Sequence, residues 1–599
     1  MRAVALIESG PVSQMAGESK DVSFLKRAGP CGSAKSVAAS PASPYPTGMT
    51  DRLLITLVQC PQMMGDIAGN AQAMLAARAE AGTCDLVVFP ELQLIGYPPE
   101  DLVLKPALIA RARAQLEQLA AATGDGGPAM LVGSVFVRDG LLYNGLALLD
   151  GGAIVAVRLK HELPNYGTFD EKRLFASAPL QPPVPFRGAM LGLPLCEDIW
   201  FPKVCGHLAA MGAEILIAPH GSPYEIEKDE RRLHNVARAR VAETGLPLVF
   251  LNRTGGQDEL VFDGASFVVN ADGSLAHQLP DWEEAMVQTE WTRGEHGWQC
   301  TPGAIHLLDP YPQDVYHAMI VGLRDYVNAN GFPGVVLGLS GGIDSALSAA
   351  VAVDALGPQR VWCVMLPSLF TSQESLDDAA QCARLLGCRL DTIPIQPAID
   401  GFDAMLEGSF AGRDGDITEE NIQSRIRAVT LMALSNKFGP MLLTTGNKSE
   451  MSVGYATIYG DMAGGYNVLK DAYKLTVFAL SRWRNANLPP LALGPDGPVM
   501  PPSVITKPPS AELRPDQRDD DSLPPYEILD PILHGLVEEE LSVADIVARG
   551  FEHDVVARIE RLLYIAEYKR RQSPPGVKLG IRNFGRDRRY PITNRFRTA

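Results

Sequence analysis

The chain has 599 residues, of which 46% are hydrophobic and 21% charged, a composition typical of a folded globular protein with more than one domain. Lys plus Arg number 53 and Asp plus Glu number 70, so the net charge of −17 argues against a general binder of nucleic acids or anionic membranes. No apolar run approaches the ~20 residues that a membrane-spanning helix needs. We therefore expect no nucleic-acid partner and no membrane partner.

The chain contains nine cysteines and no C-x-x-C pair. This argues against a disulfide framework and a zinc ribbon, and it favours a reducing, cytoplasmic location. Residues 1–50 are rich in Ala, Ser, Pro and Gly and lack the apolar core of a secretory signal, so we expect a disordered extension there. Met49, which precedes the first clear strand, is an alternative start.

From residue 51 onward, short apolar strands alternate with helical patterns, which predicts a mixed α/β domain. Strands are expected at 53–59, 85–89, 129–137, 144–149, 153–159, 189–195, 214–218 and 247–251. A hairpin turn is predicted at Asp150-Gly151-Gly152, and a helix with one charged face at 227–244. The stretch 270–312 contains several prolines, and we expect it to be rich in loops and to contain a domain boundary.

After this stretch, helices and strands alternate strictly, which predicts a parallel, doubly wound sheet. The expected order is helix 313–329, strand 334–339, helix 344–356, strand 360–366, helix 373–386 and strand 389–395. Residues 486–527 are rich in proline and polar residues and predict a long loop, and 541–572 has a helical pattern.

A glycine- and serine-rich segment lies between the expected strand 334–339 and the helix that follows it. It reads Leu337-Gly338-Leu339-Ser340-Gly341-Gly342-Ile343-Asp344-Ser345. Small residues let backbone N–H groups approach an anion closely, and the helix N-terminus favours negative charge. Gly338-x-Ser340-x-Gly342 also matches an esterase nucleophile elbow, and a glycine-rich turn in a core is a further alternative.

The full S-G-G-I-D-S string resembles the pyrophosphate-binding loop of the ATP pyrophosphatase family, which cleaves ATP to AMP and pyrophosphate. It is not a Walker A loop, because the chain contains no Gly-Lys dipeptide. The resemblance implies that ATP contacts Ser340, Gly341, Gly342, Asp344 and Ser345.

Three polar residues end apolar strands in the first half of the chain: Glu91, Lys160 and Cys196. Together their chemistry is coherent, since a carboxylate can take a thiol proton, a thiolate can attack an amide carbon and an ammonium can stabilise the oxyanion. Taken singly, each has a structural explanation: a cysteine is usually a small buried apolar residue, and charged residues at strand ends are usually solvated.

In this order the three residues resemble the active site of the nitrilase superfamily. The flanking strings 89–91, 96–102, 160–171 and 196–200 resemble the glutaminase domain of glutamine-dependent NAD⁺ synthetases. The resemblance implies that Glu91 is the general base, Lys160 the oxyanion residue and Cys196 the nucleophile. It also implies that Tyr166 and Ser222 line a glutamine pocket.

The second half adds strings that resemble the NAD⁺ synthetase domain. By this resemblance Thr445 contacts ATP, and Asp344 with Glu450 binds Mg²⁺, a carboxylate pair that suits this cation. The residues implied to contact deamido-NAD⁺ are Asn421, Arg425, Asp461, Lys474 and Ser510. Arg425 and Arg427 are two apart on an expected helix and do not share one face, so one is expected to meet phosphate and the other to be structural.

The resemblance covers roughly residues 51–599 and predicts an α/β protein of two domains. Residues 51–305 would form a nitrilase-like αββα sandwich. Residues 306–599 would form a doubly wound, Rossmann-like parallel-sheet domain of the adenine nucleotide alpha hydrolase type. The basic tail after Lys569 invites a nucleic-acid interpretation, but we expect a solvated or subunit-bridging surface.

The implied activity is that of a ligase. Glutamine would be hydrolysed at Cys196, and ammonia, carried through a channel, would attack an adenylated nicotinate carboxylate. NAD⁺, AMP, pyrophosphate and glutamate would result, with ATP as co-substrate, Mg²⁺ as cofactor and a homo-oligomer of at least two copies. Three alternatives are a plain carbon–nitrogen hydrolase, a tRNA-modifying pyrophosphatase and a non-catalytic scaffold. The intact loop and three polar residues, the acidic charge and the missing C-x-x-C pair argue against them.

Overall fold

The structure is a computed structural model that describes residues 51–514, 517 and 523–596. The expected extension 1–50, and the acidic run 519–521 of the long loop, lie outside the described residues.

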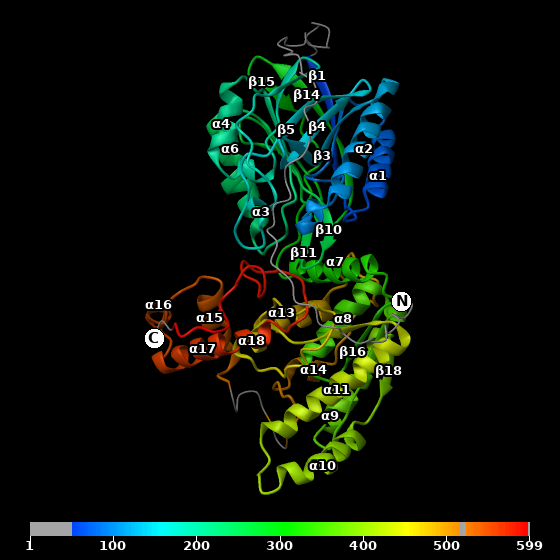
Figure 1. The fold of residues 1–599 in the computed structure, drawn as a ribbon, viewed down its shortest axis with the longest axis vertical. Coiled ribbons are helices and arrows are strands. Elements are labelled where there is room, and N and C mark those ends of the chain that lie inside the picture. Colours follow the sequence, from blue (N-terminus) through cyan, green and yellow to red (C-terminus); the bar gives the residue numbers. More distant parts are fainter. Residues whose placement is uncertain (1–50, 515–516, 518–522, 597–599) are drawn as a thin grey trace, which may run out of the picture. The chain divides into compact units, whose positions relative to one another are not determined.

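The first half of the described chain is a four-layer sandwich of two sheets between helices (Figure 1). The seven-stranded sheet has the order β15 (Gly297–Cys300), β14 (Ala285–Gly294), β1 (Arg52–Gln59), β2 (Leu86–Val88), β3 (Ala129–Arg138), β4 (Leu141–Asp150) and β5 (Ala153–Leu159). The six-stranded sheet has the order β13 (Leu275–Gln278), β12 (Phe267–Val269), β9 (Leu248–Leu251), β8 (Ile215–Pro219), β7 (Ala189–Gly192) and β6 (Val184–Phe186).

Helices cover the outer face of each sheet, which confirms the predicted αββα sandwich. On the seven-stranded sheet, α1 (Ile67–Glu80) and α2 (Pro106–Ala122) share a buried core with β2, β3 and β4. On the six-stranded sheet, α4 (Pro202–Ala210) and α6 (Arg238–Thr244) pack against β8, β9 and β12. The predicted hairpin is also confirmed, since Gly151 and Gly152 have φ of 56° and 86° between β4 and β5.

The prediction of a loop-rich segment at 270–312 is wrong in its central part. β13, β14 and β15 all lie in it, and β14 pairs antiparallel with β1 along all eight residues of β1. In β14, Thr289 and Trp291 are buried while their neighbours Gln288 and Thr292 are exposed. This alternation is typical of a strand with one covered face, and the flanking prolines obscured it in the sequence.

The second half is built on five parallel strands, β16 (Val335–Gly338), β17 (Val361–Met365), β18 (Arg389–Thr392), β19 (Met441–Thr444) and β20 (Tyr466–Asn467). Their order in the sheet is β18-β17-β16-β19-β20, which confirms the doubly wound prediction. The chain reverses direction across the sheet between β16 and β19. In open parallel sheets, ligands bind at the carboxyl ends of the strands at such a switch point.

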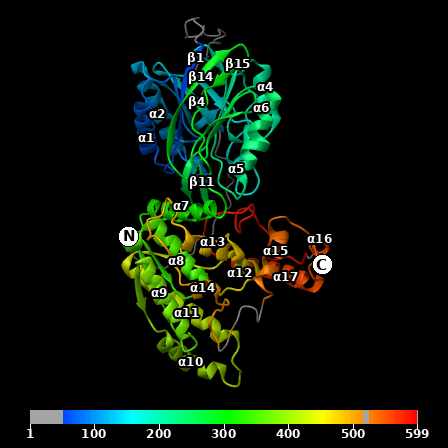
Figure 2. The same cartoon turned by 180° about the vertical axis from the view of Figure 1, so that it is seen from behind.

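Both faces of this sheet are covered, as its apolar strands require. Val335 and Leu337 of β16 contribute to a core with α7 (Gln313–Ala329) and α8 (Ile343–Leu356). Val336, which points the other way, contributes to a core with α11 (Ile417–Phe438). Figure 2 shows α8 and α11 together with α9 (Gln373–Leu386) and α10 (Gln396–Phe410) around the sheet.

The long loop 486–527 contains a short helix, α14 (Pro502–Thr506), that the sequence did not predict, and it ends where α15 (Tyr526–Val537) begins. Helices α16 (Val543–Ala548), α17 (His553–Ile565) and α18 (Glu567–Arg570) follow within the predicted helical segment. Helices α15, α16 and α17 contribute to a small separate core.

The expectation of a solvated basic tail is wrong for several of its residues. Arg570 and Arg588 are buried and both pair with Glu567, at 2.8 and 3.0 Å. Lys578 is buried and pairs with Glu225 of the first half of the chain at 3.3 Å. These three positive charges are therefore paired inside the protein and do not form part of a basic surface.

Candidate functional site

Glu91 and Lys160 meet in the sandwich domain at a fully buried ion pair. The Lys160 Nζ lies 2.7 Å from Glu91 Oε1, and neither side chain is exposed. Asn144 donates to the same Glu91 oxygen at 2.7 Å, and the Gly221 N–H donates to Glu91 Oε2 at 3.0 Å. These contacts hold the carboxylate in one orientation, as a general base requires.

A second carboxylate, Glu171, completes this group and was missed in the sequence analysis. Glu171 begins α3 (Glu171–Leu174) and accepts from Lys160 Nζ at 3.0 and 2.9 Å and from Tyr97 at 3.0 Å. Burial raises the pKa of Glu171 to about 7, although Lys160 acts against this. Burial alone would lower the pKa of Lys160, but Glu171 and Glu91 hold it well above its usual range.

Cys196 lies beside this group in a strained turn. The predicted strand ends earlier than expected, at Gly192, and Cys196 instead begins a 3₁₀-helix, Cys196–Ile199, with φ of 46°. A non-glycine residue in the left-handed region is uncommon and is often found at functional sites. Burial raises the pKa of the Cys196 thiol, Glu91 raises it further and Lys160 opposes both. The resting thiol is therefore neutral, and attack needs a base.

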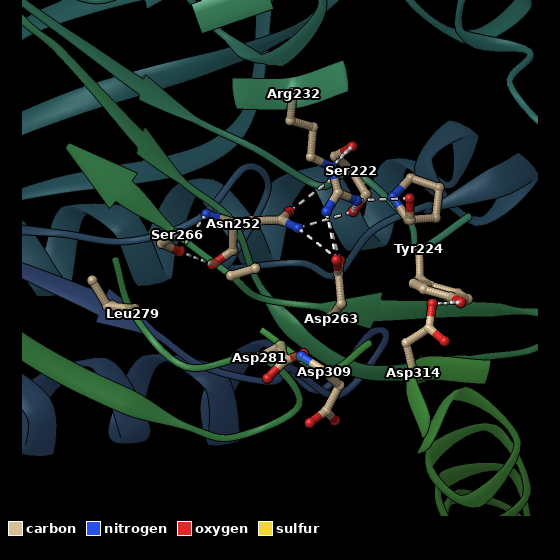
Figure 3. Close-up of polar contacts among 12 residues, drawn as sticks. Ser222, Tyr224, Arg232, Asn252, Asp263, Ser266, Leu279, Asp281, Asp309 and Asp314 are labelled. Atoms are coloured by element: carbon tan, nitrogen blue, oxygen red, sulfur yellow. Dashed lines mark hydrogen bonds and ion pairs between the residues drawn. The ribbon is translucent and has the colours of Figure 1, made fainter. Parts of the chain in front are cut away.

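The predicted glutamine-binding residues lie on two segments beside Cys196. Tyr166 is about half exposed, with a side chain that donates to both carboxylate oxygens of Glu197 at 3.1 Å. Glu197 directly follows Cys196, and burial raises its pKa. Ser222 is buried in the 220–224 loop and lies in a polar network with Arg232, Asn252 and Asp263 (Figure 3).

The predicted phosphate loop lies at the switch point of the parallel sheet, between β16 and α8. The Ser345 hydroxyl contacts the backbone N–H and the hydroxyl of Ser340 at 3.2 and 3.1 Å, and the Gly342 N–H donates to Ser340 Oγ at 3.2 Å. Gly341 has φ of +83°, and a Cβ there would lie 2.3 Å from the Ser375 carbonyl oxygen. Only glycine fits this position, so the sequence is matched to the loop's compact turn.

Asp344 and Glu450, the predicted metal ligands, converge on Lys474. The Lys474 Nζ lies 2.5 Å from Asp344 Oδ2 and 3.3 Å from Glu450 Oε1. Asn447 donates to Asp344 Oδ1 at 2.9 Å and caps α12 (Lys448–Val453) together with Glu450. Both carboxylates keep nearly a fifth of their side chains exposed, 19% and 18%. Two accessible carboxylates fit Mg²⁺, which takes one or two protein oxygens plus phosphate oxygens and water.

No group of three or more His, Cys, Asp or Glu residues within 51–514, 517 and 523–596 forms a ready metal cage.

The remaining predicted residues of this half fall into three groups. Thr445 is half-buried directly after β19, and Asp461 and Glu450 line one small cavity beside it. Asn421 and Asp461 meet at Thr457, accepting from its hydroxyl at 2.8 Å and from its N–H at 2.6 Å. Ser510 is exposed; its hydroxyl donates to the Gln517 carbonyl oxygen and accepts from the Glu512 N–H, so these contacts join it to its own loop.

Both arginines of the 421–427 string donate to backbone carbonyl oxygens. Arg425 Nε donates to Ile458 at 3.2 Å, and Arg427 Nε donates to Leu366 at 3.1 Å. Burial lowers the pKa of Arg427 to about 10, and Arg425 is the more exposed of the two. Arg425 is therefore the more accessible of the two to a ligand.

Each half of the chain matches a known protein family. The carbon-nitrogen hydrolase family matches residues 54–296, and the NAD synthase family matches residues 315–573. A glutamine-dependent NAD(+) synthetase of Rhodobacter capsulatus is 54% identical over 92% of this chain and 100% of its own length. That of Acinetobacter baylyi is 42% identical over 91% of this chain and 98% of its own length.

A solved structure of glutamine-dependent NAD⁺ synthetase from Acinetobacter baumannii, in complex with adenosine diphosphate, is also similar. It is 40% identical with a TM-score of 0.72, and the match covers 90% of this chain and 98% of that one.

The fold and the two sites thus define a protein in which a carbon–nitrogen hydrolase domain is joined to an NAD synthase domain. The chain belongs to the glutamine-dependent NAD(+) synthetase family.

Proposed function

We propose that this chain hydrolyses glutamine and uses the released ammonia to convert deamido-NAD⁺ to NAD⁺ with ATP, giving AMP and pyrophosphate. The observation that carries the proposal is the presence, in one chain, of the buried Glu91–Lys160–Cys196 group and of the serine- and glycine-rich loop at the switch point of a parallel sheet. The first suits amide hydrolysis, and the second suits phosphate binding.

In the glutaminase reaction, Cys196 attacks the side-chain amide carbon while Glu91 takes the thiol proton. The raised pKa of Cys196 keeps the proton on sulfur until then, because a thiolate beside Glu91 in a buried site is unfavourable. The Lys160 ammonium stabilises the oxyanion, and ammonia leaves with the proton that Glu91 returns. Water then hydrolyses the thioester to give glutamate and free Cys196.

In the second reaction, the nicotinate carboxylate of deamido-NAD⁺ attacks the ATP α-phosphate and displaces pyrophosphate. Ser340, Gly341, Gly342 and Ser345 bind the phosphates, since the loop offers backbone N–H groups and hydroxyls at a helix N-terminus. Lys474 adds positive charge, and Asp344 with Glu450 would hold Mg²⁺. When bound, Mg²⁺ supplies charge neutralisation at the phosphate oxygens. Asn421, Arg425, Asp461 and Ser510 belong to the dinucleotide site in this proposal, and Thr445 to the ATP site.

The division into domains 51–305 and 306–599, with ammonia passing between them through a channel, is part of this proposal. A protected passage keeps ammonia neutral, whereas free ammonia at neutral pH is mostly ammonium and is not nucleophilic. Direct contacts between the two halves support a passage from one to the other. Tyr224 donates to Asp314 at 2.7 Å, and Lys470 pairs with Glu259 at 2.7 Å.

A homo-oligomer of at least two copies is also proposed. Helix α10 contributes no buried residue, and large apolar side chains on α10 and α11 are exposed, among them Met405 at 66% and Val429 at 67%. Exposed apolar surface on neighbouring helices is often found at interfaces in soluble proteins. A second copy of this chain would cover it.

A cytoplasmic location remains a proposal as well. The structure describes eight cysteines, and all of them are free, which suits a reducing compartment. Among the helices of the described part of the chain, none has the length and apolar character needed to cross a membrane.

The direct test is an assay of the purified full-length protein with deamido-NAD⁺, ATP, Mg²⁺ and glutamine. We expect NAD⁺, AMP and glutamate to form in equal amounts. Formation of glutamate without NAD⁺ would show that the protein is an amidase and not a synthetase. The absence of both products would overturn the proposal.

A further inference from the structure

A buried arginine, Arg232, holds the loop that contains Ser222. Arg232 is 1% exposed and forms an ion pair with Asp263, in which Nη1 donates to both carboxylate oxygens at 2.8 and 2.6 Å. Nη2 donates to the carbonyl oxygens of Ser222 and Pro223, both at 2.8 Å, and Nε donates to Ser222 Oγ at 3.1 Å. These contacts use all five N–H donors of the guanidinium group (Figure 3).

Asn252 fixes the same serine from a second direction. Its Oδ1 accepts from the Ser222 N–H at 2.9 Å, and its Nδ2 donates to the Ser222 carbonyl oxygen at 3.0 Å. The backbone of Ser222 is therefore satisfied within the protein, and the residue cannot turn without breaking several buried hydrogen bonds. Each such break would be costly in a buried site.

The contact between Arg232 and the Ser222 hydroxyl sets the direction of that hydroxyl's hydrogen bonding. Because Arg232 Nε can only donate, Ser222 Oγ must accept from it and keeps its own hydrogen for another acceptor. Among the residues that the structure describes, no acceptor receives this hydrogen. A carboxylate or carbonyl oxygen of a ligand would accept this hydrogen and complete the hydrogen bonding of Ser222.

We propose that Arg232 is a positioning residue for the glutaminase reaction, which holds Ser222 so that its hydroxyl donates a hydrogen bond to an oxygen of the glutamine substrate. This inference rests on the proposed function, since it takes glutamine as the occupant of the pocket. Arg232 itself is covered by protein and touches no substrate.

The location of Arg232 agrees with this role. It lies in a π-helix, Arg231–Ala237, between α5 (Lys228–Glu230) and α6. π-helical turns are rare and occur frequently at functional sites. Asp263 ends β11 (Leu260–Asp263), which pairs with β10 (Thr254–Gln257). The carboxylate that balances the charge of Arg232 is therefore fixed on a hairpin.

The test compares Arg232→Lys, Ser222→Ala and the double variant in the full-length protein. Lysine keeps the charge beside Asp263 but lacks Nε and the planar fork, so it cannot hold the hydroxyl and both carbonyls together. We expect each single variant to raise the KM for glutamine about ten- to a hundredfold, with a smaller change in kcat. The double variant should be little worse than either single one, because both act through the same hydrogen bond.

Three further measurements separate positioning from a structural effect. NAD⁺ formation with ammonium instead of glutamine should keep its wild-type rate, and so should alkylation of Cys196 by iodoacetamide. Arg78→Lys is the matched control, since Arg78 also pairs with an aspartate, Asp125, and donates to a backbone carbonyl oxygen, but on α1. It should leave the KM for glutamine unchanged.

An unchanged KM in Arg232→Lys, or fully additive effects in the double variant, would overturn the inference. An equal loss with ammonium would show that Arg232 supports the fold instead. If Arg232→Lys does not fold, Ser222→Ala decides alone, because it keeps the arginine's other contacts, and an unchanged KM there would refute the hydroxyl donor. Wild-type protein that releases no glutamate from glutamine would overturn the proposed function itself.

Discussion

The two sites of this chain differ in how far their charged side chains are buried. In the sandwich domain, Glu91 and Lys160 are fully buried and Glu171 nearly so, and their charges are paired with one another. In the parallel-sheet domain, Asp344 and Glu450 remain partly exposed around Lys474. A small neutral amide can enter a closed, prearranged site. A nucleotide with its metal ion brings its own charge and needs ligands that can exchange partners.

The largest expected effect comes from removing the nucleophile of the closed site. Cys196→Ala should abolish NAD⁺ formation from glutamine, by about a thousandfold or more, and leave the ammonium-driven reaction intact. The measurement is the initial rate with each nitrogen source. Cys205→Ala is the matched control, because Cys205 is also buried but lies on α4. Retained glutamine use in Cys196→Ala would mean that the nucleophile is misassigned.

A change in the open site should instead affect the reactions with both nitrogen sources alike. Asp344→Asn removes a negative charge beside Lys474, and we expect both the glutamine- and ammonium-driven rates to fall about a hundredfold or more. The rate as a function of Mg²⁺ concentration should shift to higher concentrations. Asp391→Asn, on β18 and paired with Arg389, serves as the control and should behave like the wild type. A loss confined to glutamine would contradict the assignment.

The second carboxylate of the closed site should have a smaller, pH-dependent effect. With its pKa raised to about 7, Glu171 is charged above that pH and protonated below it, so the glutamine-driven rate should fall as pH drops through about 7. Glu171→Gln should lower the rate at pH 8 about ten- to a hundredfold. It should also remove the inflection near pH 7, as measured in glutamate-release profiles. An unchanged inflection would assign it to another group.

The last prediction concerns the backbone of the phosphate loop and is measured on stability rather than on rate. Gly341→Ala must place a Cβ 2.3 Å from a carbonyl oxygen at φ +83°, and we expect a loss of about 2–4 kcal/mol in the free energy of unfolding. Gly140→Ala is the control, since it has φ +78° but no atom within 4 Å, and it should lose only about 1 kcal/mol. Denaturant titration measures both. Equal losses would show that crowding at Gly341 is relieved by movement of the loop.

Local patterns in the sequence predicted most elements of the fold. Helices 313–329 and 373–386 match α7 and α9 in both bounds, because apolar spacing and flanking residues fix such helices locally. β14 was missed because its partner, β1, lies far away in the chain, and only that pairing completes its covered face. The flanking prolines obscured the alternation of β14, and a partner this distant adds no local signal of its own.

The candidate sites show the same limit. Glu91, Lys160 and Cys196 could be selected from the strings around them, and the structure brings them together. Glu171 lay in one of those strings but received no role, since it reaches Lys160 only after the loop between them folds back. Arg232 carried no signal, because its five contacts depend on β11 and on the 220–224 loop.

The pairing of β1 with β14 also constrains how the protein is made. Arg52 and Glu290, which pair across these strands, are 238 residues apart. At about 5–20 residues per second, roughly 12 to 48 s pass on the ribosome between the synthesis of the two. Throughout that interval one side of β1 has unpaired N–H and C=O groups, the kind of edge that recruits other chains. Crowding of nascent chains and slow codons between β1 and β14 therefore bear directly on the yield of soluble protein.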